Sequence, residues 1–245
     1  MLLNRYDEGA GLDYQIGLRR LDAPGAVLLG TGEAVRLSPD SRFVLGITYN
    51  QPSLFLLPTG AGERRSLTTP GFKYLTGGWF PDGKRVLFIA EHGSEPVAAY
   101  VQDLDGGSPH KLSPGFPAML VDFGVSVSPD SQWFFGWQAA GPPVIVPTDG
   151  GEPRALPNLN ENDSPGAWTP DGHGLIVARR APDLSGATIV RMDIETGRLE
   201  TLKTIKVAEA SGLRRLTFIV TPDGRTVVYN AGRYLTDLYL VEGLK

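Results

Sequence analysis

Two short stretches carry residue types that could handle a metal ion or a phosphate group. Asp122-Phe-Gly124 spells a metal-binding triplet of protein kinases, and Gly78 to Lys84 reads Gly-x-x-x-x-Gly-Lys, as in phosphate-binding loops. The first has no accompanying His-Arg-Asp loop. The second is followed by Arg85 instead of the Ser or Thr that would bind magnesium, and by a strand instead of a helix. We therefore interpret both as parts of strands and turns.

The other residues with catalytic or ligand chemistry form no known site pattern. His92, His110 and His173 do not pair at the spacing of zinc ligands, and there is no Gly-x-Ser-x-Gly motif of a hydrolase. The absence of cysteine excludes disulfides, thiolate metal sites and cysteine nucleophiles. We expect no cofactor and no metal ion. Five carboxylates recur at equivalent positions of a repeat, and we interpret them as turn caps: Asp40, Asp82, Asp130, Asp171 and Asp223.

Composition excludes a helical protein. The 245 residues include 31 glycines and 20 prolines, and the longest stretch without either is 198–211. Most of the other stretches are shorter than a typical helix of about 11 residues but long enough for strands of about 5 residues. The net charge is −4, with no basic stripe, so we expect no nucleic-acid partner. No apolar stretch approaches the roughly 18 residues of a membrane span, so we expect no membrane segment in this chain.

Two turn motifs alternate along the whole chain. The first is a Pro-Asp turn, in which Pro presets φ, Asp bonds its own backbone, and a following Gly supplies positive φ. Its prolines, Pro39, Pro81, Pro129, Pro170 and Pro222, are separated by 42, 48, 41 and 52 residues. The second is a glycine turn at Gly25, Gly60, Gly106, Gly150, Gly197 and Gly243. Two interleaved periods of this length indicate a repeat architecture.

Each repeat unit predicts four short strands joined by these turns. This pattern predicts an all-β fold, a β-propeller of about six four-stranded blades with incomplete first and last blades. A β-sandwich is the alternative, but it gives no reason for the long period. We expect one domain over residues 1–245, with blades at about 1–32, 33–69, 70–113, 114–157, 158–206 and 207–245. The missing first Pro-Asp turn favours a piece of a longer propeller protein over a ring with trimmed ends.

These Pro-Asp-Gly repeats resemble the TolB-like, WD-repeat-like propellers of bacteria over essentially the full chain. The closing segment, residues 234–245, is similar to the end of the sensor propeller of bacterial eukaryotic-type serine/threonine kinases. The resemblance implies a module that binds a ligand or a protein partner, outside the cytoplasm if the chain belongs to a membrane-anchored kinase. Expressed alone, the chain would be cytoplasmic. Kinase activity would belong to another domain, because this chain carries no kinase residues.

Strand polarity divides the connections between two edges of each blade. The Pro-Asp and glycine turns share one edge, and the longer, more varied connections share the other. Because binding residues concentrate in variable loops on a rigid scaffold, we predict that a protein or small ligand docks on the long-loop edge. The candidate binding residues are Lys73, Tyr74, His92, Phe116, Trp137, Arg179, Arg180, Arg233 and Tyr234.

The predicted inner strands carry few groups for catalysis. Their candidates are Arg36, Asp122, Ser126, Arg215 and Thr217, and an active site needs convergent acid, base or nucleophile groups. We therefore expect a binding or sensor module that is not an enzyme. Two alternatives remain open, a propeller enzyme with its site in the channel and the accessory propeller of a peptidase or hydrolase. The oligomeric state is left open.

Overall fold

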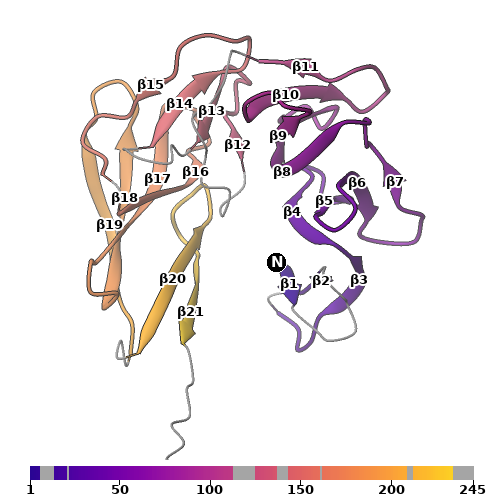
Figure 1. Cartoon of the computed structure of the whole chain (residues 1–245). Coiled ribbons are helices and arrows are strands. Elements are labelled where there is room, and N and C mark those ends of the chain that lie inside the picture. Colours follow the sequence, from indigo (N-terminus) through magenta and orange to yellow (C-terminus); the bar gives the residue numbers. More distant parts are fainter. Residues whose placement is uncertain are drawn as a thin grey trace, which may run out of the picture. The chain divides into compact units, whose positions relative to one another are not determined.

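The computed structural model describes residues 1–5, 14–20, 22–112, 125–136, 143–160, 162–208 and 212–233, and their regular structure consists entirely of strands (Figure 1). The all-β prediction is confirmed. Even the longest stretch without Gly or Pro forms a strand, Leu199–Lys206. The chain divides into two compact units, Met1–Leu159 and Asn160–Lys245.

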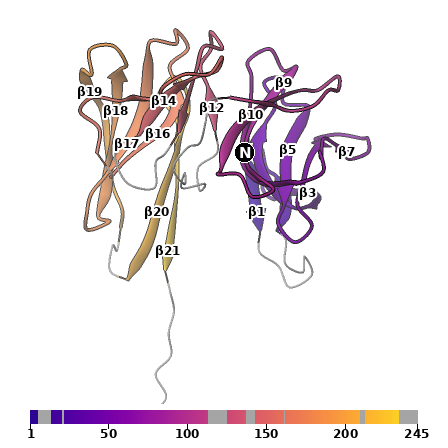
Figure 2. The same cartoon turned by 45° about the horizontal axis from the view of Figure 1, so that its top comes forward.

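The first unit contains four antiparallel sheets, each built from strands that follow one another in sequence (Figures 1 and 2). The first sheet has three strands, β1 (Leu2–Arg5), β2 (Gln15–Leu18) and β3 (Val27–Thr31). The second has β4 (Glu33–Leu37), β5 (Phe43–Thr48), β6 (Ser53–Pro58) and β7 (Arg65–Ser66). The third has β8 (Phe72–Trp79), β9 (Arg85–His92), β10 (Ala98–Asp103) and β11 (His110–Lys111). The fourth has β12 (Ser126–Val127), β13 (Trp133–Gly136), β14 (Val144–Pro147) and β15 (Arg154–Ala155).

The second unit contains two sheets with the same meander topology. The fifth sheet has β16 (Asp163–Trp168), β17 (Gly174–Arg180), β18 (Gly186–Asp193) and β19 (Leu199–Lys206). In the sixth, β20 (Leu213–Val220) pairs with β21 (Val227–Arg233), and the rest of the predicted last blade lies outside the described residues. Six antiparallel sheets of this kind in the described residues confirm the predicted propeller-like arrangement. The single domain and its exact blade boundaries stay predictions.

The Pro-Asp turns have the local chemistry that the sequence predicts. In the second sheet the Ser38 hydroxyl donates to Asp40 Oδ1 at 2.6 Å and accepts the Phe43 N–H at 2.9 Å. Asp40 Oδ1 also accepts the Arg42 N–H at 3.1 Å. Each aspartate of the motif therefore caps a tight turn. The positive φ falls on the residue after it, which is Ser41, Gly83, Ser131, Gly172 or Gly224.

The glycine turns lie beside the Pro-Asp turns within each sheet. In the second sheet the Thr59 N–H donates to Arg42 O at 2.9 Å, and its hydroxyl donates to Ser41 O at 2.9 Å. The fourth sheet repeats the contact, where the Thr148 N–H donates to Gln132 O at 2.9 Å. Both turn types therefore share one edge of the sheet, here termed the turn edge, and the longer connections share the loop edge.

The core of the first unit lies between successive sheets. Alternate residues of β9 point to opposite faces, so Phe88 packs with the second sheet while Leu87 packs with the fourth. Trp79 lies 7% exposed in the first of these clusters, and its indole N–H donates to Arg36 O at 3.3 Å. Trp79 therefore packs between the second and third sheets.

Candidate functional site

Six of the nine predicted binding residues are described, and all six lie in strands instead of loops. Lys73 and Tyr74 are on β8, His92 is on β9, Arg179 and Arg180 are on β17, and Arg233 is on β21. Phe116, Trp137 and Tyr234 lie outside the described residues. The strands run further than predicted because the alternation of buried and exposed side chains continues to their ends, as in Phe72, Lys73 and Tyr74 of β8.

The loop edge of the third sheet brings three of the candidates together. The His92 imidazole stacks on the Phe72 ring, with centroids 4.3 Å apart and planes 15° apart. Gly71 approaches the imidazole so closely that a Cβ would lie 3.1 Å from His92 Nε2, and its φ of +88° favours glycine. The two rings form a platform held at the sheet edge.

Tyr74 supports this edge from inside. Its side chain is fully buried. Its hydroxyl accepts the Thr69 N–H at 2.8 Å and donates to Thr69 O at 3.3 Å. Burial raises the pKa of the Tyr74 phenol. Tyr74 therefore positions the connection before β8 and does not itself reach a partner.

Two ion pairs lie at this edge of the sheet. Lys111 and Glu95 lie on the face of the rings, and Lys73 and Glu91, which neighbour Phe72 and His92 along their strands, lie on the opposite face. Lys73 Nζ lies 3.2 Å from Glu91 Oε2, and Lys111 Nζ lies 2.6 Å from Glu95 Oε2. The Lys111 ammonium lowers the pKa of the Glu95 carboxyl. Exposed pairs of this kind contribute at most about 1 kcal/mol, so a partner can replace them at low cost. The platform surface is defined by His92, which stacks on the buried Phe72 ring, together with Glu95 and Lys111.

The candidate arginines of the second unit have other roles. Arg179 forms a bidentate pair with Asp163, which is fully buried, at 2.7 Å from Nε and 2.8 Å from Nη2. This hydrogen bond raises the pKa of Arg179. Arg233 Nη2 donates to Ala208 O at 3.5 Å, and Arg180 lies partly exposed at the end of β17. Arg179 thus fastens the connection before β16 to β17.

The inner strands hold the residues considered for catalysis. Arg36 lies on β4, and one guanidinium nitrogen donates weakly to Val125 O at 3.4 Å. Burial lowers the pKa of Arg36. Ser126 is on β12, Arg215 and Thr217 are on β20, and Asp122 lies outside the described residues. Within the described ranges, no three His, Asp or Glu side chains are placed to hold a metal ion.

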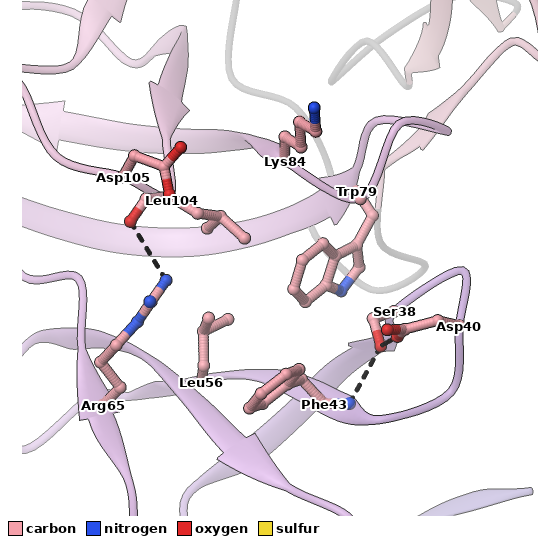
Figure 3. A pocket seen from close by; sticks show the side chains of 10 residues that line it. Ser38, Asp40, Phe43, Leu56, Arg65, Trp79, Lys84, Leu104 and Asp105 are labelled. Atoms are coloured by element: carbon pink, nitrogen blue, oxygen red, sulfur yellow. Dashed lines mark hydrogen bonds between the residues drawn. The ribbon is translucent and has the colours of Figure 1, made fainter.

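A pocket that sequence analysis missed lies at the turn edges of the second and third sheets (Figure 3). Its volume is about 180 Å³. Apolar side chains of both sheets line it, and charged side chains of both signs stand among them. The second sheet contributes Ser38, Asp40, Phe43, Leu56 and Arg65, and the third contributes Trp79, Gly83, Lys84, Leu104 and Asp105. The sequence signal for this pocket is a difference between two repeats. The same position after the Pro-Asp turn is Phe43 in the second sheet and Arg85 in the third.

The meandering sheets, the capped turns and the face-to-face packing of sheets define a β-propeller. In the described part of the chain, no helix has the length and apolarity needed to cross a membrane. No family model matches the chain.

Solved structures with the same fold have low sequence identity to this chain. TolB from Acinetobacter baumannii is 16% identical, with a TM-score of 0.68 over 94% of this chain and 63% of that one. Oligogalacturonate lyase from Vibrio parahaemolyticus is 14% identical, with a TM-score of 0.61 over 92% of this chain and 71% of that one. A prolyl endopeptidase is 14% identical, with a TM-score of 0.53 over 93% of this chain and 36% of that one. The chain has the TolB-like propeller fold.

One curated protein is related in sequence. It is the "uncharacterized peptidase YuxL" of Bacillus subtilis, 23% identical over 184 residues, which cover 74% of this chain. The matched region spans about a quarter, 24%, of the relative's length.

These relatives correct the expectation that the chain is not an enzyme. The curated relative is named a peptidase, and two of the solved structures are a lyase and an endopeptidase. The expectation rested on the small number of polar groups on the inner strands. That reasoning was wrong because a propeller scaffold is compatible with catalysis as well as with binding, and a few residues decide between them.

Proposed function

We propose that this chain is a binding propeller that recognises a polypeptide on the platform surface of its third sheet. The observation that carries the proposal is the Phe72–His92 stack at the loop edge, beside a connection that the buried Tyr74 hydroxyl holds at Thr69. Rigid aromatic groups surrounded by exchangeable charges are the usual anchors of protein interfaces. The likeness to TolB propellers supports a binding module.

A second candidate function is the accessory propeller of a peptidase. The sequence relation to a protein named a peptidase favours it, and so does the fold shared with a prolyl endopeptidase. In this case the platform surface would hold a polypeptide substrate while another domain cleaves it. Both candidates require the same first step, which is binding of an extended polypeptide.

The kinase-linked sensor stays a narrower prediction. It rests on the resemblance of residues 234–245, which lie outside the described residues, and none of the proteins named above is a kinase. A phosphorylation assay of a longer protein that contains this chain would test it.

Selection from a random dodecapeptide display library on the immobilised chain tests the binding proposal. Selected peptides should bind at least tenfold more weakly to the double variant Lys111→Glu, His92→Ala. The matched control is Arg42→Glu, an exposed charge reversal on the turn edge, which should bind them as the unaltered chain does. No enrichment of peptides, or equal binding to the platform variant, would overturn the proposal.

The same peptides test whether the chain itself cleaves what it binds. Each is incubated with the chain and followed by mass spectrometry. Cleavage that the platform variant slows would place enzyme activity in the chain itself, which neither candidate expects. Stable, uncleaved complexes favour a binding module whose catalytic partner, where there is one, lies elsewhere.

A further inference from the structure

The pocket between the second and third sheets has an apolar floor and a charged rim (Figure 3). Leu56, Phe43 and Trp79 form the floor, and Leu56 and Trp79 are almost completely buried there. Arg65 Nη2 donates to Leu104 O at 3.1 Å and so fastens the two sheets along one side. The site is therefore a defined concavity between two rigid elements.

The repeat itself shows how such a junction can be closed. Arg85 occupies in the third sheet the position that Phe43 has in the second. It lies 4.1 Å from the centroid of the Phe80 ring, and its Nε lies 2.8 Å from Asp82 Oδ2. Arg85 thus covers the aromatic ring and neutralises the turn aspartate of its own repeat.

In the fourth sheet, Trp133 occupies the position of Phe43, and an arginine of the outer strand covers its ring. Arg154 lies 5.2 Å from the centroid of the Trp133 ring. Arg65, which occupies the corresponding outer-strand position of the second sheet, instead bonds Leu104 O. In the described part of the chain, no guanidinium is placed over Phe43. The pocket is therefore open for two reasons. Phe43 stands where the next repeat has an arginine, and Arg65 bonds Leu104 O instead of covering the Phe43 ring.

The rim offers charges that the described residues leave without partners. The Lys84 ammonium has no hydrogen-bond or ion-pair acceptor among them, and the Asp105 carboxylate has no donor. Asp40, by contrast, is held by the Ser38 hydroxyl, which lowers the pKa of Asp40. A ligand of this pocket can thus bring a carboxylate to Lys84 and an N–H donor to Asp105.

We infer that this pocket binds an extended peptide through one aromatic side chain preceded by an acidic residue. The volume of about 180 Å³ suits one ring, since a cavity of roughly 150 Å³ holds benzene. The acidic side chain pairs with Lys84 and the unspent donors of Arg65, and a backbone N–H of the peptide donates to Asp105. The inference concerns the turn edge and is independent of the platform surface at the loop edge.

Capped tripeptides test the site on the full chain by NMR. The probe is acetyl-Glu-Phe-Gly-amide, and acetyl-Glu-Ala-Gly-amide lacks the ring. The phenylalanine peptide should shift the indole N–H signal of Trp79, assigned with a Trp79→Phe variant, and the alanine peptide should bind at least fivefold more weakly. Lys84→Glu should weaken binding at least fivefold and should favour acetyl-Lys-Phe-Gly-amide instead.

Two further variants serve as a control and as a second test of the pocket. Arg225→Glu reverses an exposed charge at the equivalent position of the last Pro-Asp turn, which does not line the pocket, and should leave binding unchanged. Phe43→Arg removes the aromatic floor and places a guanidinium beside Asp40, as Arg85 lies beside Asp82 in the next repeat, and should abolish binding. Equal binding of the phenylalanine and alanine peptides, or no effect of Lys84→Glu, would overturn the inference. A Trp79 shift that grows with protein concentration alone would also overturn it, because it identifies a second copy of the chain as the occupant.

Discussion

Replacing Arg179 with methionine should destabilise the second unit more than replacing its partner Asp163 with alanine. Asp163 is completely buried, and its carboxylate accepts two bonds from Arg179 and one from the Asn160 N–H at 2.9 Å. Without Arg179 the charge stays buried with only that backbone donor. Removing one partner of a buried ion pair costs about 3–5 kcal/mol, and we expect Arg179→Met to lose this much free energy of unfolding.

The reverse deletion leaves a different residue behind. The Arg179 side chain is 35% exposed, so water can solvate the guanidinium when Asp163 is gone. The loss is then that of charged hydrogen bonds, about 1–3 kcal/mol. The double variant removes the buried charge together with its partner, so it should be more stable than Arg179→Met alone by at least about 1 kcal/mol.

Urea unfolding of the four proteins, followed by tryptophan fluorescence, measures this cycle. Trp168 lies buried in β16 of the same sheet and reports on it. Additive losses in the double variant, or a larger loss for Asp163→Ala than for Arg179→Met, would refute the reasoning. That result would also restore Arg179 as a candidate for partner binding, because its charge would then not be needed for the fold.

Three further predictions concern the turns and the sheet contacts. Gly78→Ala should cost about 2–4 kcal/mol in urea unfolding because its Cβ would collide with the carbonyl of Val125. Gly60→Ala, with no atom within 4 Å, should change stability by no more than about 0.5 kcal/mol. Ser131→Gly should stabilise by about 0.5 kcal/mol because φ there is +63°, measured the same way. The hydroxyl two residues before Asp171 lowers its pKa. The stability that Asp171 contributes is therefore full above an unfolded pKa of about 3.9 and lost as pH falls through the lower folded value. Unfolding measured from pH 6 to 3 should show the advantage over Asp171→Asn shrinking below about pH 4.

The sheets and turns could be predicted from the sequence because their causes are local. The Asp40 carboxylate bonds only within its own turn. The residue after the turn aspartate has positive φ, and it is Gly83 in one repeat and Ser41 in another. These contacts span five residues or fewer. They repeat along the chain, so each repeat supports the interpretation of the others.

The strand ends and the pocket could not be predicted in the same way. Lys73 and Tyr74 are predicted on the long-loop edge, but pairing with β9 extends β8 to Phe72 and places both in a strand. Arg65 and Arg154 occupy equivalent positions, yet one bonds a neighbouring sheet and the other covers a ring of its own sheet. That choice depends on what the adjacent sheet offers, which no local pattern records.

The same limit explains why inner-strand composition was a poor guide to enzyme function. In a strand, alternate side chains point to opposite faces, and in the first unit those faces are filled by the contacts between successive sheets. Few polar groups on the inner strands, such as Arg36, remain for chemistry. An active site in such a fold must therefore gather single residues from several sheets. These residues are far apart in the sequence, and in a fully extended chain hundreds of ångströms would separate them. A sparse set of polar groups is what either a binding propeller or a catalytic one would show, so the geometry of those groups, not their number, separates the two.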